Sequence, residues 1–359
     1  MTESPITVLH LVNSLQWGGV RRHVLDLRRG LAAHGVRSLI AAWLPSGDPR
    51  GGDPDVYPLP LYDASGTRKS AAGFFESVRV LRALLRRENV ALVHEHSRYA
   101  ALLGDLATRG RNTARLYTAH NVFEDLRRFP FYPRDILAPS AIVRDHFRAH
   151  VRRAGRGRIT VVRHGVDIPE MEIRNEETHP RFCFAGRLCE EKGIRVLVEA
   201  LGLLHAAGGE LPEIDILGDG PLRAWMSEQI ASTLHGMPIR VHGYVTDPLP
   251  RIAGATALLF PSIALDSAPY IVLEALASAV PVIASDLPVL RELVRHGESG
   301  WTVPPGDAPA LAGALRVAIA EPARMRRMGI AGQSIVRGLH GQDRMCAETA
   351  AVYREILRR

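Results

Sequence analysis

The sequence predicts an α/β fold made of two Rossmann-like domains with a cleft between them. Short apolar segments alternate with amphipathic, helix-like segments along most of the 359 residues, and this alternation occurs in two successive sets. The sets are separated by residues 169–180, a stretch rich in Glu, Asn, Thr and Pro that has no hydrophobic periodicity. Strands that alternate with helices form parallel, doubly wound sheets with right-handed crossovers. A chain of this length with 46% hydrophobic residues can bury two sizeable cores.

The apolar runs place the expected strands in each domain. The first domain, residues 1–168, opens with a strand, a turn through residues 13–19 and a helix over residues 20–34. Its strands are expected at residues 6–12, 36–42, 91–95, 115–119, 136–138 and 159–162. Residues 169–180 form the expected linker. The second domain, residues 181–342, has expected strands at residues 181–185, 213–217, 239–242, 257–261, 282–284 and 300–303.

Composition excludes several classes of protein. The three cysteines form no CxxC pair, which argues against a disulfide framework or a zinc site and favours a reduced, cytoplasmic compartment. The first residues lack the build of a secretion signal, and no apolar run approaches the roughly 18 residues of a membrane span. The net charge of +7 comes almost wholly from arginine, since Lys69 and Lys192 are the only lysines. This diffuse charge has no interleaved aromatic pattern, so nucleic acid is not an expected partner.

Two acidic residues frame a segment that reads as strand, turn and helix over residues 260–275. Asp266 lies in the turn and Glu274 inside the helix. Such a turn lies at the carboxyl edge of an α/β sheet, where these folds bind ligands, and a helix opening at Pro269 and Tyr270 would present backbone N–H groups to an anion. Carboxylates near an anion suit a ligand rich in hydroxyls. The alternative is that Asp266 caps the helix and Glu274 is solvated.

A second charged cluster follows the strand at residues 181–185. Arg187 can clamp phosphate oxygens in a fork, while Lys192 supplies a point charge, so together they can neutralise a diphosphate without a metal ion. Lys192 draws attention because lysine is so rare in this chain. The alternative is a solvated helix start in which Glu191 and Lys192 pair locally.

Glycines follow three of the expected strands. Gly18 and Gly19 stand just before a helix, so backbone can approach a phosphate or a sugar closely there, although the GxGxxG spacing of a dinucleotide site is absent. Gly218 and Gly243, the latter followed by Tyr244, would let a flat nucleobase lie against the backbone. Ordinary tight-turn glycine is the alternative for Gly18 and Gly19.

Histidines also stand at strand ends. His120 directly follows a strand, where a side chain projects from the sheet edge and can meet a sugar hydroxyl; a structural histidine is the alternative. His94 and His96 lie on one face of a strand, but we expect no third ligand nearby and therefore no metal site.

The segment at residues 74–88 mixes apolar residues with four arginines in the pattern of an amphipathic basic helix. Such a helix can lie on anionic lipid, which would point to a lipid-linked acceptor. We favour the alternative, an ordinary helix that packs on the sheet, so peripheral membrane contact is not the preferred expectation.

Taken together, these motifs resemble the family-four retaining glycosyltransferases of the GT-B fold, also called glycosyltransferase group 1. The resemblance runs in order along nearly the whole chain. It rests on Gly18-Gly19, His120, Arg187 with Lys192-Gly193, Gly218-Asp219-Gly220, His242-Gly243, and the two acids with seven residues between them, Asp266 and Glu274, the second of which begins Glu274-Ala275-Leu276-Ala277.

The resemblance implies a role for each matching residue. Glu274 would bind the ribose of a nucleotide-diphosphate sugar, which serves as co-substrate with no cofactor or metal, and Asp266 would hold the transferred sugar. Arg187 and Lys192 would hold the diphosphate. The remaining contacts would come from Gly18, Gly19, Gly218, Gly243 and Tyr244, from the backbone at Pro269, Tyr270 and Ile271, and from His120 near the sugar's primary hydroxyl. The first domain would bind the acceptor, and the C-terminal helix, residues 343–359, would pack back on it.

The implied activity is a hexosyltransferase-type transfer that retains the anomeric configuration. The donor is a UDP or GDP sugar, and the acceptor is a hydroxyl of a small molecule, natural product, glycan or lipid carrier. No residue stands out as a nucleophile, so same-face attack is expected. The sequence departs from the family at Asp266, where glutamate is usual. Alternative functions are a GT-B sugar-nucleotide epimerase and a catalytically impaired sugar-nucleotide-binding homologue.

Overall fold

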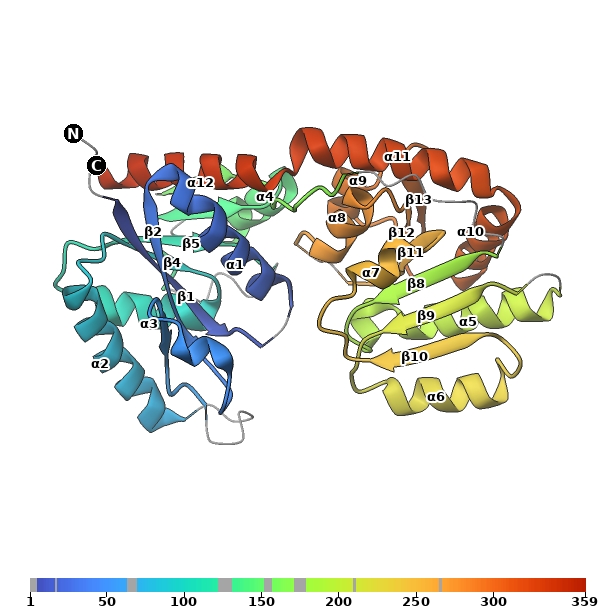
Figure 1. Ribbon diagram of the computed structural model, residues 1–359, viewed down its shortest axis with the longest axis horizontal. Coiled ribbons are helices and arrows are strands. Elements are labelled where there is room, and N and C mark those ends of the chain that lie inside the picture. The colour runs from blue at the N-terminus through green and yellow to red at the C-terminus, as the bar shows by residue number, and fades with distance from the viewer. Residues whose placement is uncertain are drawn as a thin grey trace. The chain divides into compact units, whose positions relative to one another are not determined.

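The computed structural model describes residues 5–16, 18–62, 70–121, 131–151, 157–170, 179–208, 211–264 and 267–359. The chain divides into two compact units, one formed by Met1–Gly165 together with Gln342–Arg359 and the other by Val166–Gly341. Each unit contains one parallel sheet with helices on its faces (Figure 1). The predicted doubly wound α/β class is therefore confirmed. Most of the expected linker, residues 171–178, lies outside the described residues.

The first unit is built on a seven-stranded sheet in the order β3-β2-β1-β4-β5-β6-β7. Its strands are β1 (Ile6–Ser14), β2 (Val36–Trp43), β3 (Val56–Pro58), β4 (Leu92–Glu95), β5 (Ala114–Thr118), β6 (Asp135–Ala138) and β7 (Arg158–Val161). Its helices are α1 (Gly19–Leu31), α2 (Ala71–Arg87), α3 (Arg98–Thr108), α4 (Ala141–His150) and α12 (Gln342–Leu357), with 3-10 turns at Ala32–His34 and Pro49–Gly52. Only the short edge strand β3 has no counterpart among the expected strands.

Successive side chains of β1 point to opposite faces of the sheet and belong to separate hydrophobic cores in the first unit. Leu9 and Leu11 face the layer of α2 and α3, whereas Val8 and Val12 face the layer of α1. Helix α12 contributes buried Tyr353 to the core on the α1 side of the sheet, which also contains Val8. Side chains of β1 with even numbers, including His10, therefore point towards α1 and α12.

Helix α2 uses its apolar face within the first unit. Leu81, Leu84 and Leu85 are buried in the core against the sheet and α3, and Phe74 packs at its margin. This packing agrees with the favoured expectation of an ordinary sheet-covering helix, and it leaves Phe75 as the one strongly exposed aromatic residue of the helix, at 72%. Within the described ranges, no helix is both long enough and apolar enough to cross a membrane.

The second unit has a six-stranded sheet in the order β10-β9-β8-β11-β12-β13. Its strands are β8 (Arg181–Ala185), β9 (Glu213–Leu217), β10 (Ile239–Gly243), β11 (Ala257–Phe260), β12 (Val282–Ser285) and β13 (Gly300–Val303). Its helices are α5 (Ile194–Ala206), α6 (Arg223–Ser232), α7 (Leu249–Ala253), α8 (Tyr270–Ala277), α9 (Pro288–Leu293), α10 (Ala308–Ala320) and α11 (Pro322–Leu339), with a 3-10 turn η5 at Glu190–Lys192.

The second sheet is also covered on both faces, which explains its continuous apolar strands. Phe182 and Phe184 pack in the layer of α5, α6 and α10, whereas Cys183 and Ala185 pack in the layer of α7, α8 and α9. Buried parallel strands read as unbroken hydrophobic runs because both faces meet helices. All four strands β8, β9, β10 and β11 run the same way, so the loops that follow them lie at one edge of the sheet.

Candidate functional site

Four adjacent loops at the carboxyl edge of the second unit carry most of the expected ligand-binding residues. The strand order β10-β9-β8-β11 places Gly243 and Tyr244, then Gly218, then Arg187 and Lys192 in neighbouring loops, with the turn that leads to α8 as the fourth. Residues separated by up to about ninety positions in sequence therefore come together along one edge. This is where open α/β sheets bind ligands.

Backbone hydrogen bonds tie the first three of these loops together. The Gly218 N–H donates to Gly243 O at 2.8 Å, and the Gly186 N–H donates to Leu217 O at 2.9 Å. A Cβ at Gly218 would lie 1.8 Å from Gly186 O, so only glycine fits there. The Leu188 N–H closes the set by donating to Asp219 O at 2.9 Å. The glycine at position 218 is thus required by close backbone approach, which ordinary turn chemistry does not explain.

The loop with Lys192 is bonded to the turn that precedes α8. Glu191 O accepts hydrogen bonds from the Ile263 N–H at 2.9 Å and from Ser262 Oγ at 3.0 Å. Gly193 follows with φ of +69°, and a Cβ there would lie 1.9 Å from Pro261 O. Lys192 Nζ lies 5.3 Å from the centroid of the Phe260 ring. The Lys192 loop and the turn before α8, which the sequence suggested as two separate clusters, are therefore held together by hydrogen bonds.

Helix α8 begins one residue later than the sequence pattern indicates. Pro269, expected in the first helical turn, is the residue before it, with φ of −70° and ψ of 115°, and the helix starts at Tyr270. Glu274 lies inside the helix, as expected, and is half-buried, while Ile271 is partly buried in its first turn. Asp266 lies outside the described residues. Of the residues named for this edge, Arg187 is exposed, Tyr244 is 48% exposed and Lys192 is half-buried.

An ion-paired group beneath this edge was missed from the sequence. The buried Asp215 carboxylate on β9 accepts a hydrogen bond from His242 Nε2 at 2.6 Å and another from an Arg181 guanidinium nitrogen at 3.2 Å. Burial raises the pKa of Asp215, but the hydrogen bonds from His242 and Arg181 outweigh it and lower the pKa overall. The His242–Asp215 hydrogen bond therefore links β10 to β9 immediately before Gly243. A charged residue in the middle of an apolar strand was the available signal.

In the first unit, Gly18 and Gly19 stand at the start of α1. Gly18 has φ of +94° and no atom within 4 Å of a Cβ added to it, and Gly19 is the first helical residue. Both glycines are exposed. A positive φ favours glycine even without crowding, so the turn alone accounts for Gly18.

His120 lies inside a cluster of imidazoles and is only 7% exposed. Its Nε2 lies 3.1 Å from His96 Nδ1, its ring stacks on His164 with centroids 5.4 Å apart, and His23 meets it edge-on at 4.8 Å. Burial, reinforced by the neighbouring His164, lowers the pKa of His120 well below its usual range. The ring is therefore neutral near pH 7.

The expectation that His94 and His96 have no third histidine nearby is wrong. His10 on β1 lies beside them, and the three side chains offer ring nitrogens within 4.8 Å of one another. On the opposite face of β4, the buried Glu95 carboxylate accepts hydrogen bonds from two guanidinium nitrogens of Arg115, at 2.7 and 3.2 Å. Sequence reasoning missed both groups, because each joins residues of different strands.

Comparison with known proteins agrees with this geometry. The family described as "Glycosyl transferases group 1" matches residues 179–321, and "Glycosyltransferase Family 4" matches residues 17–170. The amylovoran biosynthesis glycosyltransferase AmsK of Erwinia amylovora is 32% identical over 169 residues, which are 44% of this chain and 41% of AmsK. The phosphatidyl-myo-inositol mannosyltransferase of Mycobacterium leprae is 29% identical over 353 residues, covering 89% of this chain and 88% of that enzyme.

Solved structures match the fold along the whole chain. The crystal structure of Anabaena HepE in complex with UDP-glucose has a TM-score of 0.78 and 17% identity, and the match covers 98% of this chain and 100% of that one. At this identity the likeness concerns the fold alone. The two family matches divide near the boundary between the two units, at residues 165 and 166. The chain belongs to the group 1 glycosyltransferases and has the GT-B fold.

Proposed function

We propose that this protein transfers a sugar from a nucleotide-diphosphate sugar to an acceptor hydroxyl, with retention of anomeric configuration and without a catalytic metal ion. The observation that carries the proposal is the edge of the second sheet. There, bonded loops bring the cationic Lys192 loop, the close-packed Gly218 backbone and helix α8 with Glu274 side by side. A diphosphate, a base and a ribose need those three kinds of partner.

The donor is assigned residue by residue in the second unit. Glu274 accepts hydrogen bonds from the ribose hydroxyls, since a carboxylate is a strong acceptor for two donors. Arg187 and Lys192 contact the diphosphate, and the loop of Gly243 and Tyr244 receives the base. HepE, which shares the fold, was solved with UDP-glucose, and this supports UDP as the nucleotide to test first.

The first unit completes the proposal. In this unit, the backbone N–H groups at Gly18 and Gly19 at the start of α1 can bind an anionic group, and His120 can bind a sugar hydroxyl. Because His120 is neutral, it can act as a hydrogen-bond donor or acceptor without adding charge.

The mechanism follows from the charge that develops as the glycosidic phosphate bond breaks. The departing diphosphate gains negative charge, which Arg187 and Lys192 stabilise, while the anomeric carbon becomes oxocarbenium-like. The acceptor oxygen attacks from the face that the diphosphate leaves. The acceptor proton passes to the departing phosphate oxygen, so atoms and charge balance without a protein nucleophile.

The acceptor is a hydroxyl of a small molecule, natural product, glycan or lipid carrier. One relative is named for amylovoran biosynthesis and another is a phosphatidyl-myo-inositol mannosyltransferase. The second name supports including phosphoinositides in the acceptor panel.

The decisive experiment incubates the purified chain with UDP-glucose, UDP-galactose, UDP-N-acetylglucosamine and GDP-mannose, each with and without a panel of polyol, oligosaccharide and phosphoinositide acceptors. We expect acceptor-dependent release of nucleoside diphosphate, an α-linked product by NMR, and the same rate in EDTA. Conversion of a donor to its epimer in the absence of acceptor would instead identify an epimerase. Nucleotide binding without turnover would identify an impaired homologue, and Asp266→Glu then tests whether that position is the cause.

Substitution separates nucleotide binding from transfer. Glu274→Ala should weaken UDP binding by roughly 10- to 100-fold, because it removes a charged hydrogen-bond acceptor that contributes about 1.5–3 kcal/mol. Asp266→Ala should leave UDP affinity unchanged and slow transfer. The matched control is Glu228→Ala, an exposed glutamate on α6 of the same unit. Calorimetry with free UDP decides: equal losses in both test variants would contradict the assigned roles.

A further inference from the structure

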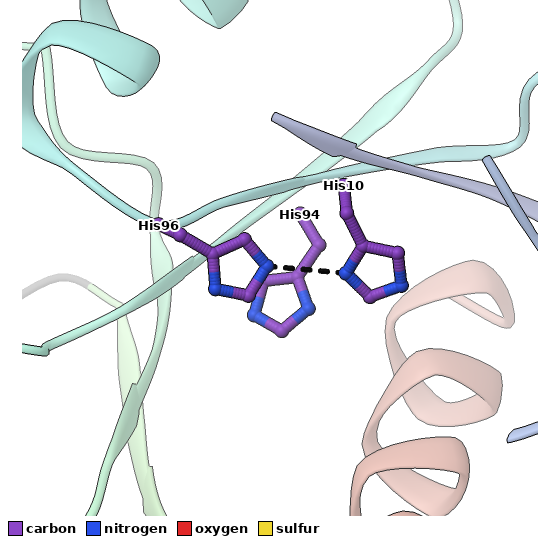
Figure 2. Close-up of side chains that lie close together, drawn as sticks. All are labelled: His10, His94 and His96. Carbon is purple, nitrogen blue, oxygen red and sulfur yellow. Dashed lines mark hydrogen bonds between the residues drawn. The ribbon is translucent and has the colours of Figure 1, made fainter. Parts of the chain in front are cut away.

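Three buried histidines meet on the face of the first sheet that α1 and α12 cover. Strands β1 and β4 are parallel neighbours, and their register places His10 directly opposite His94. His96 follows two residues later, so its side chain points to the same face. Figure 2 shows the three rings converging, and their ring nitrogens lie within 4.8 Å of one another. All three residues have no exposed surface.

The rings of His10 and His96 each have a nitrogen atom that faces the other ring. His10 Nδ1 and His96 Nε2 are 3.1 Å apart, as the dashed line in Figure 2 marks. At that distance the nitrogens share one proton in the absence of a metal ion. Two nitrogens bound to one tetrahedral ion at 2.0–2.1 Å would be about 3.3–3.4 Å apart. The pair is therefore spaced for an ion with a shift of only a few tenths of an ångström.

The outer nitrogens of the rings already have the partners that metal-bound histidines require. His10 Nε2 lies 3.4 Å from Ser38 Oγ, and His96 Nδ1 lies 3.1 Å from His120 Nε2. A ligating histidine typically donates its second ring N–H to such a group, which fixes its tautomer and orientation. His10 needs only to carry its proton on Nε2, towards Ser38, to free Nδ1 for an ion.

The third ring is held from both sides by hydroxyls. His94 Nδ1 lies 2.7 Å from Tyr353 Oη and His94 Nε2 lies 2.6 Å from Thr118 Oγ1. Ligation through either nitrogen would displace one hydroxyl and leave the other as the second partner. The displaced hydroxyl would remain beside the ion, next to the fourth coordination position, which water or a hydroxyl can fill.

The chemistry of the three ligands indicates which metal ion the site would hold. A set of imidazoles without thiolates or carboxylates suits zinc, copper, nickel or cobalt, and does not suit magnesium or calcium.

We propose that His10, His94 and His96 form a binding site for one divalent transition-metal ion, with Zn²⁺ as its best match. A second group, His23, His96 and His120, also has nitrogens within 4.8 Å of one another and shares His96. It continues the imidazole chain to His120, the more exposed end at 7%, and so offers a route by which an ion can enter. The site lies within the first unit and does not depend on the proposed glycosyl transfer, which should proceed in EDTA.

The test loads tag-free, chelator-treated protein with Zn²⁺ or Co²⁺ and measures bound metal by mass spectrometry. A second histidine pair needs a control. His146 and His150 of α4 stack on each other with ring centroids 4.3 Å apart and can themselves hold an ion. We expect one tightly bound ion per chain in the wild type and in His146→Gln, visible absorption of four-coordinate Co²⁺, and loss of that ion in His10→Gln. At a metal concentration 100 times Kd, the melting temperature of the first unit should rise by about 5–10 °C.

A second measurement keeps the test decisive if His10→Gln fails to fold. X-ray absorption of the Zn²⁺-loaded wild type should give three imidazole nitrogens at about 2.0–2.1 Å. The proposal is overturned if the wild type takes up no stoichiometric metal, if His146→Gln abolishes uptake, or if fewer than three imidazoles surround the ion. In those cases the rings form a hydrogen-bonded network only.

Discussion

Acid should unfold the first unit at a pH at which the second unit is still folded. The first unit buries five imidazoles whose pKa values burial lowers far below the usual range: His10, His23, His94, His96 and His120. In the unfolded chain the same histidines have pKa values near 6.5. As the pH falls below that value, the unfolded chain takes up protons that the folded unit cannot accept, so the folded state loses stability.

The size of the effect follows from the number of rings. Each neutral buried histidine destabilises the folded unit by about 1.4 kcal/mol at pH 5.5, and five together by about 7 kcal/mol. Glu95 acts in the opposite sense, because burial raises its pKa to about 8 against the attraction of Arg115. It adds roughly 2–3 kcal/mol of stability between pH 7.5 and 5.5. The net loss of about 4–5 kcal/mol is a large part of the 5–15 kcal/mol typical of a domain.

The assay is guanidinium unfolding of metal-free, tag-free protein at pH 7.5, 6.5 and 5.5. Hydrogen exchange of peptides from β1 and β4 reports on the first unit, and peptides from β8 and β11 report on the second. The first unit's transition should move to lower denaturant as the pH falls, while the second unit's transition stays nearly constant. His146→Gln, outside the cluster, should behave like the wild type. A loss of less than 2 kcal/mol in the first unit at pH 5.5 would refute the reasoning.

Two further substitutions test packing at the sites. Gly218→Ala should weaken UDP binding at least tenfold, since its Cβ would lie 1.8 Å from Gly186 O and force two loops of the proposed donor site apart. Gly313→Ala, in an uncrowded helix, is the calorimetric control and should bind UDP normally. Arg115→Leu should lower the first unit's free energy of unfolding by about 3–5 kcal/mol at pH 9, because the buried Glu95 carboxyl loses the attraction and hydrogen bonds of Arg115. The double variant with Glu95→Leu should recover most of that loss in the same denaturant titration, and an unchanged deficit would contradict an origin in the buried charge.

The sheets were predictable because their strands are buried on both faces. Continuous apolar runs such as Phe182–Ala185 identify a parallel strand covered by helices, and the expected limits agree with the structure to within one or two residues. Strand β3 was missed for a physical reason. It has only three residues, ends in Pro58 and pairs with β2 alone at the sheet edge, so little burial marks it in the sequence.

The candidate ligand-binding edge was predictable in outline and not in detail. Rossmann topology sends every loop after a parallel strand to the same edge, so Arg187, Gly218 and Gly243 could be grouped from their positions alone. The bond from Ser262 to Glu191 O could not be, because it depends on the conformation of two loops seventy residues apart. Sequence position thus predicts which loops are neighbours, whereas the contacts between them depend on backbone angles such as that of Gly193.

The histidine cluster could have been found by adding strand order to the sequence pattern. In a doubly wound sheet the first strand lies beside the fourth, so His10 on β1 and His94 on β4 are candidates for cross-strand neighbours even though 84 residues separate them. Searching for a third ligand near His94 and His96 along the chain misses this, since the nearest histidines in space come from other strands. Register then decides the face: His10 alternates with Leu9 and Leu11, so it points away from their core and towards α12. A polar residue that recurs on one face of adjacent buried strands is therefore better searched for across a sheet than along the sequence.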